Sequence, residues 1–310
     1  MRKSGIKQSI LNLFYGLIAV QWLCIISDVV FNICHKIAIQ KLSQINQNLY
    51  KTPWFNFVFL CYQNLNLISN HSKMTKLSVN INKIATLRNA RGGNVPDLLK
   101  VAQDIQQFGA HGITIHPRPD ERHIRYQDAR DLKPIVYTEY NIEGNPQHNF
   151  IELVLECKPT QVTLVPDAIG ALTSNAGWDT IKHRDYLTEV IQEFNRNGIR
   201  TAIFVDADER MVEGAKATGA DRIELYTESF AHQYVIGNKA GIEPFVKAAL
   251  KANELNIGIN AGHDLSLDNI KFFKENIPNL LEVSIGHALI SESLYLGLEN
   301  VVNMYLQKLK

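Results

Sequence analysis

From residue 76 onward, short runs of aliphatic and β-branched residues alternate with longer segments whose apolar positions recur at helical spacing. The short runs are nearly continuous in Val, Ile, Leu and Thr, which is typical of strands that are buried on both faces. The pattern predicts eight strands, at 76–81, 112–116, 135–142, 161–165, 200–205, 222–226, 256–260 and 281–285.

Helical patterns separate these strands. Segment 96–108 places Leu98, Ala102 and Ile105 on one face, and Gly109 follows as a natural C-terminal stop. The same reasoning predicts helices at 146–157, 185–197, 209–218, 241–254, 266–275, 288–293 and 294–309. Eight strand–helix units match the ~250 residues of a (β/α)₈ barrel. A doubly wound sheet is the alternative, but it usually has fewer strands, and no GxGxxG follows the first strand. The sequence predicts an α/β TIM barrel with short extra helices.

Polar and titratable side chains gather near the C-terminal end of nearly every predicted strand, where TIM barrels build their active sites. A lone histidine after a strand is usually a loop residue. Three histidines at equivalent strand ends favour a functional role. The strand-end candidates are Asn80, Asn82, Lys83, His116, Arg118, Glu143, Thr173, Glu224, His263, Gly286 and His287.

Some of the acidic residues have a simpler explanation. Glu143 and Glu224 could be ion-pair partners at the barrel rim. Asp206 and Asp208 are better explained as rim or N-cap residues.

Phosphate is the anion that the pattern favours. Small residues in the loops after strands 7 and 8, NAGHD and GHA, expose backbone N–H groups near helix N-termini. Arg118 and His123 form a second cationic cluster after strand 2. Arg88 and Arg91 could lie on a solvated face, although Arg91 beside two glycines fits an anion contact better. Two anion sites indicate two phosphorylated ligands or one bisphosphate.

The sequence contains no motif typical of metal-dependent, dinucleotide-dependent or nucleotide-hydrolysing enzymes. His116, Glu143 and His263 could be metal ligands, but the chain has no HExxH motif or cysteine cluster. Dinucleotide and Walker motifs are also missing. Acid–base chemistry remains, because histidine titrates near neutrality and a partly buried glutamate can act as a base.

Residues 1–73 differ in charge and composition from the rest. They hold seven Lys or Arg residues and a single acid, Asp28, whereas residues 74–310 hold 25 basic and 30 acidic residues. Three of the four cysteines precede Met74, and the single Cys157 after it fits a reducing cytosol. Residues 11–34 could be a membrane or targeting segment, but polar residues interrupt them. A folded extension is a third alternative. We favour upstream sequence translated from a start codon assigned too early, so that 74–310 is the catalytic domain.

Residues 74–310 resemble the pyridoxine 5′-phosphate synthase family of vitamin B6 biosynthesis. The resemblance spans this whole segment, and its motifs keep their order and spacing. They are VNINKIATLRNARG (79–92), GITIHPRPDERHI (112–124), NIEGNP (141–146), LVPD (164–167), FVDAD (204–208), INAGHDL (259–265) and SIGHALI (284–290).

The resemblance implies a TIM barrel that condenses 3-amino-2-oxopropyl phosphate with 1-deoxy-D-xylulose 5-phosphate. The products are pyridoxine 5′-phosphate, phosphate and water, and no metal or redox cofactor is needed. It implies a symmetric homo-oligomer, often an octamer. The cysteine usage predicts a cytoplasmic protein, the net charge of +1 gives no argument for a nucleic-acid partner, and the interrupted apolar segment makes a membrane partner the less favoured alternative.

The resemblance also implies roles for individual residues. Glu143 and His116 would be bases and His263 an acid, with Glu224 as a possible assistant. The amino-oxopropyl phosphate would contact Asn80, Arg91, Asp264, Gly286 and His287. The deoxyxylulose phosphate would contact Asn82, Lys83, Arg118, His123 and Thr173.

Three features depart from the family. Asn82-Lys83 replaces a usual Asp-His, Asp264 replaces a common glycine, and the 73-residue extension is foreign to it. Another phosphosugar epimerase or aldolase is the alternative enzyme, with Lys83 as the strand-end lysine for a Schiff base. A barrel that only binds a phosphorylated ligand is the non-enzymatic alternative.

Overall fold

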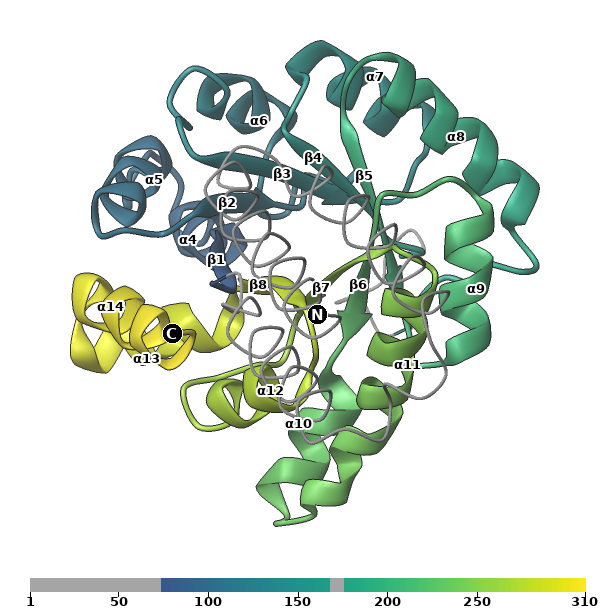
Figure 1. Cartoon of the computed structure of the whole chain (residues 1–310). Coiled ribbons are helices and arrows are strands. Elements are labelled where there is room, and N and C mark those ends of the chain that lie inside the picture. The colour runs from purple at the N-terminus through teal and green to yellow at the C-terminus, as the bar shows by residue number, and fades with distance from the viewer. Residues whose placement is uncertain (1–73, 168–175) are drawn as a thin grey trace, which may run out of the picture. The chain divides into compact units, whose positions relative to one another are not determined.

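The computed structural model describes residues 74–167 and 176–310, which contain a closed barrel of eight parallel strands ringed by helices (Figure 1). Each strand pairs with the next in sequence, and β8 closes the barrel by pairing with β1. The strands are β1 (Lys76–Asn80), β2 (Gly112–Ile115), β3 (Glu139–Gly144), β4 (Gln161–Leu164), β5 (Arg200–Val205), β6 (Arg222–Tyr226), β7 (Gly258–Gly262) and β8 (Leu280–Ile285). The predicted TIM barrel is confirmed.

The helices follow the strands in the order that the fold requires. They are α4 (Asn82–Asn89), α5 (Leu98–Gln107), α6 (Tyr126–Leu132), α7 (His148–Cys157), α8 (Arg184–Arg196), α9 (Glu209–Ala217), α10 (Glu228–Val235), the 3₁₀ helix η3 (Lys239–Ile242), α11 (Glu243–Glu254), α12 (Ile270–Asn276), α13 (His287–Leu296) and α14 (Leu298–Lys308).

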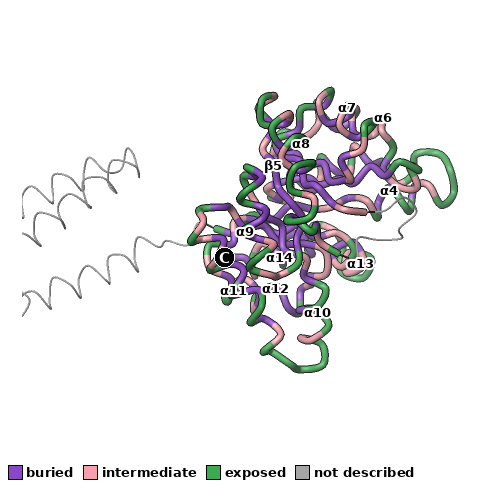
Figure 2. The backbone as a smooth tube through the Cα atoms, turned by 90° about the vertical axis from the view of Figure 1, so that its right-hand side faces the viewer, coloured by how far each residue is buried: buried purple, intermediate pink, exposed green. Residues whose placement is uncertain are grey.

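Successive side chains along each strand point to opposite faces of the barrel sheet. Leu77, Val79 and Ile113 belong to the buried apolar core that the helices cover, and the strands form the buried centre in Figure 2. Side chains between these positions bond across the barrel. Ser284 of β8 reaches Glu143 of β3, although these strands are not neighbours. The barrel interior is therefore polar, and its carboxyl groups are removed from bulk water.

Two strands begin later than the sequence predicted. Residues 135–138 do not start β3, because the N–H groups of Ile135 and Val136 bond the Leu132 carbonyl at the end of α6. Similarly, Ile257 donates to Ala252 and terminates α11, so that β7 starts at Gly258.

The sequence reading missed three helices and misplaced two helix starts by four residues. Helix α14 begins at Leu298 and not at residue 294, because α13 continues to Leu296 and Gly297, with φ of 83°, separates the two helices. Helices α4, α6 and α10 are short and bury few apolar residues, so their periodicity is weak. Helix α12 begins at Ile270 and not at residue 266, because Ser266 and Asn269 form a turn before it. Asp208 accepts from the Arg210 N–H at 2.8 Å, which confirms the predicted N-cap.

Residues 1–73 and Thr173 lie outside the described residues, so the predictions about them remain predictions. In the part of the chain that is described, no helix combines the length and apolar character needed to cross a membrane.

Candidate active site

A cavity of about 280 Å³ opens at the C-terminal ends of the barrel strands. Twelve of the fourteen residues proposed from the sequence line it. The lining comprises Asn80, Asn82, Lys83, His116, Arg118, His123, Glu143, Val165, Phe204, Glu224, His263, Asp264, Ser284, Gly286 and His287. The barrel topology brings these residues together from strands that are far apart in sequence.

The β1–α4 junction holds one wall through amide hydrogen bonds. Asn80 Oδ1 accepts from the backbone N–H of Asn82 at 3.0 Å. Asn82 Oδ1 in turn accepts from the backbone N–H of His116 at 2.9 Å. Asn82 thus fixes the end of β2 as well as lining the cavity.

Two glycines allow close packing around the site. A Cβ on Gly262 would lie 2.4 Å from Glu224 Oε1, so any other residue there would displace that buried carboxyl group. A Cβ on Gly286 would lie 3.1 Å from the Cβ of Asn80. Gly286 also precedes the first turn of α13, whose free N–H groups favour an anion.

Glu143 is buried at the centre of the site. Its Oε2 accepts from Asn80 Nδ2 and its Oε1 accepts from Ser284 Oγ, both at 3.4 Å. Burial raises the pKa of the Glu143 carboxyl group well above its ordinary value, and the nearby carboxyl groups of Glu224 and Asp167 raise it further. The surroundings of Glu143 therefore disfavour its charged form.

His116 is also buried, and its ring lies between two carboxyl groups. Nδ1 is 4.0 Å from Glu143 Oε2, and Nε2 is 3.7 Å from Asp167 Oδ2. Burial lowers the pKa of His116 well below its ordinary value, and the charge of Arg118 lowers it further. Burial therefore disfavours the charged form of both neighbours, which favours a neutral imidazole as proton acceptor beside a neutral carboxyl group as proton donor.

Glu224 lies deeper, inside the barrel. Burial raises the pKa of its carboxyl group to about 8, with a further contribution from Glu282. Its Oε2 accepts from Thr163 Oγ1 at 3.4 Å. Glu224 is therefore not an exposed rim residue, which was one of the explanations that the sequence allowed.

His263 sits in the left-handed region of backbone conformation, with φ of 91°. Its Nδ1 lies 2.5 Å from Asp264 Oδ2, and Tyr226 packs edge-on against its ring. The backbone N–H of Asp264 donates to Thr227 Oγ1 at 3.3 Å. The unusual aspartate at 264 therefore contacts the predicted acid directly.

Another part of the cavity wall is formed by basic side chains. Arg118 and His123 come from the loop after β2, and Lys83 comes from the start of α4. Burial lowers the pKa of His123 to about 4, and Arg118 is the next largest cause. His123 is thus a neutral hydrogen-bonding group here, while Arg118 and Lys83 supply positive charge.

The structure does not bring Arg91 into the cavity. Arg91 is exposed after α4 and is not among the lining residues. Conversely, the sequence reading missed Ser284 and Asp167 as site residues. Both lie in motifs noted above, SIGH and LVPD, but their partners are distant in sequence.

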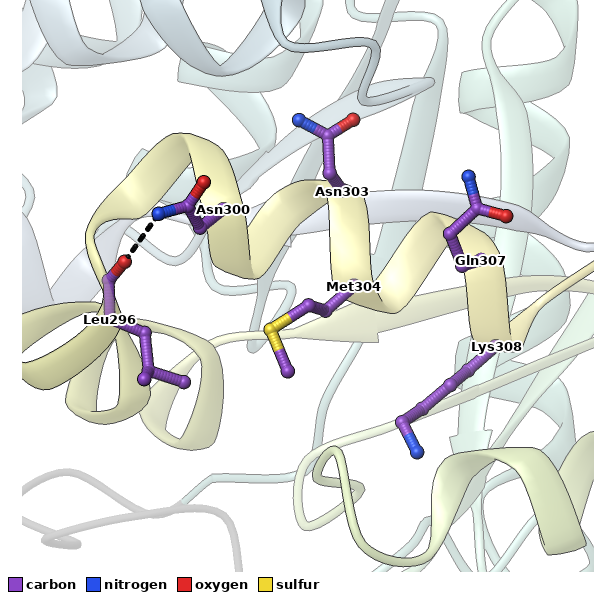
Figure 3. A pocket seen from close by; sticks show the side chains of 6 residues that line it. All are labelled: Leu296, Asn300, Asn303, Met304, Gln307 and Lys308. Carbon is purple, nitrogen blue, oxygen red and sulfur yellow. Dashed lines mark hydrogen bonds between the residues drawn. The ribbon is translucent and has the colours of Figure 1, made fainter.

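Within residues 74–167 and 176–310, no three His, Cys, Asp or Glu residues cluster as metal ligands would. A separate shallow groove runs along α14, lined by Leu296, Asn300, Asn303, Met304, Gln307 and Lys308 (Figure 3). This groove contains no acid–base pair. The chemistry of the described residues is therefore concentrated at the barrel mouth.

Solved structures with the same fold differ widely in sequence. A 3-keto-L-gulonate-6-phosphate decarboxylase from Vibrio cholerae superposes with a TM-score of 0.53 at 9% identity, covering 76% of this chain and 97% of that one. A thiamine phosphate pyrophosphorylase from Pyrococcus furiosus gives 0.52 at 12% identity, covering 76% and 96%. These similarities show the fold alone.

Sequence relatives are much closer. A pyridoxine 5′-phosphate synthase from Flavobacterium johnsoniae is 84% identical over 237 residues, which is 76% of this chain and 100% of the relative. One from Christiangramia forsetii is 68% identical over the same shares. One from Porphyromonas gingivalis is 58% identical, covering 76% and 99%. The family model described as "Pyridoxal phosphate biosynthesis protein PdxJ" matches residues 77–310. The chain therefore belongs to the PdxJ family.

Proposed function

We propose that this chain is a pyridoxine 5′-phosphate synthase that condenses 3-amino-2-oxopropyl phosphate with 1-deoxy-D-xylulose 5-phosphate. The family membership and the relatives at 58–84% identity support this activity. The observation that carries it is the single cavity in which buried acid–base groups meet two regions suited to phosphate. Two phosphorylated substrates require both regions.

The region around α13 suits the amino-oxopropyl phosphate. The backbone of Gly286 and His287 at the helix N-terminus would bind the phosphate, and Asn80 packs beside Gly286. Asp264 and Arg91 are the remaining proposed contacts of the amino-oxopropyl phosphate. Arg91 is exposed and lies outside the cavity lining, so its contribution would require it to move toward the substrate.

The basic wall suits the deoxyxylulose phosphate. Arg118 presents a guanidinium group that can bind a phosphate through two N–H donors, and Lys83 adds a point charge. His123 and Asn82 offer neutral hydrogen bonds to hydroxyl groups. Thr173 is the remaining proposed contact.

Glu143, His116 and His263 would carry the proton transfers. The amine substrate brings positive charge, which would lower the raised pKa of Glu143 and release a carboxylate able to act as a base. Burial lowers the pKa of His116, which favours the neutral ring that can accept a proton. His263 would protonate a leaving group, and Glu224 would assist from inside the barrel.

The test is direct. The purified full-length chain is incubated with both substrates, and pyridoxine 5′-phosphate is measured by mass spectrometry and absorbance. We expect product only when both substrates are present. Absence of product while calorimetry shows that both ligands bind would contradict the synthase and favour a ligand-binding barrel.

We also propose that the enzyme is cytoplasmic and forms a homo-oligomer, an octamer by analogy with the family. The described residues of α13 and α14 leave Leu294, Tyr295 and Met304 exposed, and apolar surface of this kind is commonly covered in symmetric assemblies. Light scattering of the purified chain measures the assembly, and a monomeric mass would contradict it.

A further inference from the structure

Asp167 is a buried carboxylate directly beyond β4 that the residue roles above leave unused. Its side chain is 6% exposed. One oxygen, Oδ2, lies 2.5 Å from Arg118 Nη2 and 3.7 Å from His116 Nε2. The Asp167 backbone carbonyl accepts from Asn145 Nδ2 at 3.0 Å, which anchors the residue. A single carboxylate oxygen thus contacts a proposed phosphate ligand and approaches a proposed base.

Asp167 reaches these partners from behind the substrate cavity. It is not among the residues lining that cavity, whereas His116 and Arg118 are. Instead, Asp167 shares with both residues a small adjacent cavity of about 30 Å³, also lined by Tyr126 and Phe150. A substrate in the main cavity would meet His116 and Arg118, with Asp167 behind them.

The charges around His116 explain why such a carboxylate is needed. Burial disfavours the protonated ring most, and the charges of Arg118 and Arg122 in the β2 loop disfavour it further. A base that accepts a proton becomes an imidazolium, which is costly to leave unpaired in a buried site. The two described carboxyl groups near the ring are Glu143 and Asp167. Asp167 contacts the guanidinium of Arg118 at 2.5 Å, whereas burial raises the pKa of Glu143, so Asp167 is the better source of negative charge.

Resting on the proposed function, we propose that Asp167 is a positioning residue that stabilises the imidazolium of His116 and aims Arg118 at the substrate phosphate. Arg118 has five N–H donors, so its bond to Asp167 through Nη2 leaves the guanidinium able to make other contacts as well. The carboxylate therefore acts on the proton acceptor and on the anion site together, without contacting the substrate.

The test uses Asp167→Asn in the full-length chain, with steady-state kinetics for both substrates. The asparagine keeps the shape but removes the charge, so we expect kcat to fall by about 10²-fold and KM for deoxyxylulose phosphate to rise several-fold. Asp208→Asn is the matched control, because Asp208 also follows a strand and pairs with an arginine, and asparagine is an equally good N-cap. Control kinetics should match the unmodified chain.

A double-mutant cycle separates positioning from a merely structural role. If Asp167 acts on kcat through His116, Asp167→Asn should cost little further kcat in a His116→Ala background. A full additional loss there, or unchanged kcat and KM in the single variant, would overturn the proposal.

Folding is checked by circular dichroism. If Asp167→Asn does not fold, Asp167→Glu takes its place, since it keeps the charge but displaces it by one methylene. It should lower kcat in the unmodified background and not in the His116→Ala background. Equal losses in the two backgrounds would again overturn the proposal. An inactive unmodified chain would instead count against the proposed function.

Discussion

The guanidinium of Arg88 forms two hydrogen bonds with the carboxylate of Asp128, at 2.7 and 2.8 Å, and the arginine side chain is 2% exposed. Arg88 also donates to the His123 carbonyl at 3.2 Å, so this pair braces the loop that carries the basic wall. The sequence allowed Arg88 a position on a solvated helix face. In the structure its side chain is buried on the inner face of helix α4, so that explanation is wrong.

We therefore predict that Asp128→Ala lowers the free energy of unfolding by ~3–5 kcal/mol, because it leaves a buried guanidinium without its partner. Urea unfolding measures this value. Asp104→Ala is the control, since it removes the exposed pair with Lys100 and should cost under ~1 kcal/mol. Similar losses of unfolding free energy in both variants would show that the buried pair of Arg88 and Asp128 stabilises the fold no more than an exposed pair does.

His263→Ala and Glu143→Gln should each reduce kcat by ~10²–10⁴, because each removes a proposed proton-transfer group. Product formation at saturating substrates measures the effect. His148→Ala changes an exposed histidine on α7 and should leave the rate unchanged. Near-normal turnover in either site variant would remove that residue from the mechanism.

Glu224 should make the protein less stable as the pH rises. Its carboxyl group has a raised pKa of about 8 in the folded chain, so the folded state keeps a proton that the unfolded state releases. Stability is therefore lost between the ordinary value of 4.5 and about 8, at on the order of 1 kcal/mol per pH unit.

Glu224→Gln should reduce this loss, as measured by urea unfolding at pH 5.5 and pH 8. Glu189→Gln, at an exposed position on α8, should retain the pH dependence of the unmodified chain. The same pH dependence in the Glu224 variant and the unmodified chain would count against a buried, protonated Glu224.

Lys83→Met should raise KM for deoxyxylulose phosphate several-fold while product still forms, because Lys83 supplies charge and not a covalent bond. Lys271→Met, an exposed change on α12, is the matched control. Borohydride treatment with substrate should trap no adduct. A trapped adduct at Lys83 would favour the aldolase alternative.

A protein comprising residues 74–310 should retain the kcat of the full chain, since the relatives match this segment over nearly their whole length. Kinetics of both proteins test this prediction. A large loss of kcat in the shorter protein would assign residues 1–73 a role in folding or activity. Mass spectrometry of the native N-terminus addresses the start directly.

The strand-end pattern predicted most of the site because a parallel barrel gathers the ends of all its strands at one mouth. His116, Glu143 and His263 could be placed together on that basis alone. The starts of β3 and β7 could not be predicted, because helix-terminating hydrogen bonds compete for the same residues.

The sequence by itself determined the barrel, the family and the chemical groups at the strand ends, because local periodicity and motif order carry that information. Only the tertiary structure decided the pKa values and the contacts of those groups. Burial raises the pKa of Glu143 and lowers that of His116, and the fold places Asp167 against Arg118. These effects depend on desolvation and on contacts between residues distant in sequence, which a linear pattern does not record.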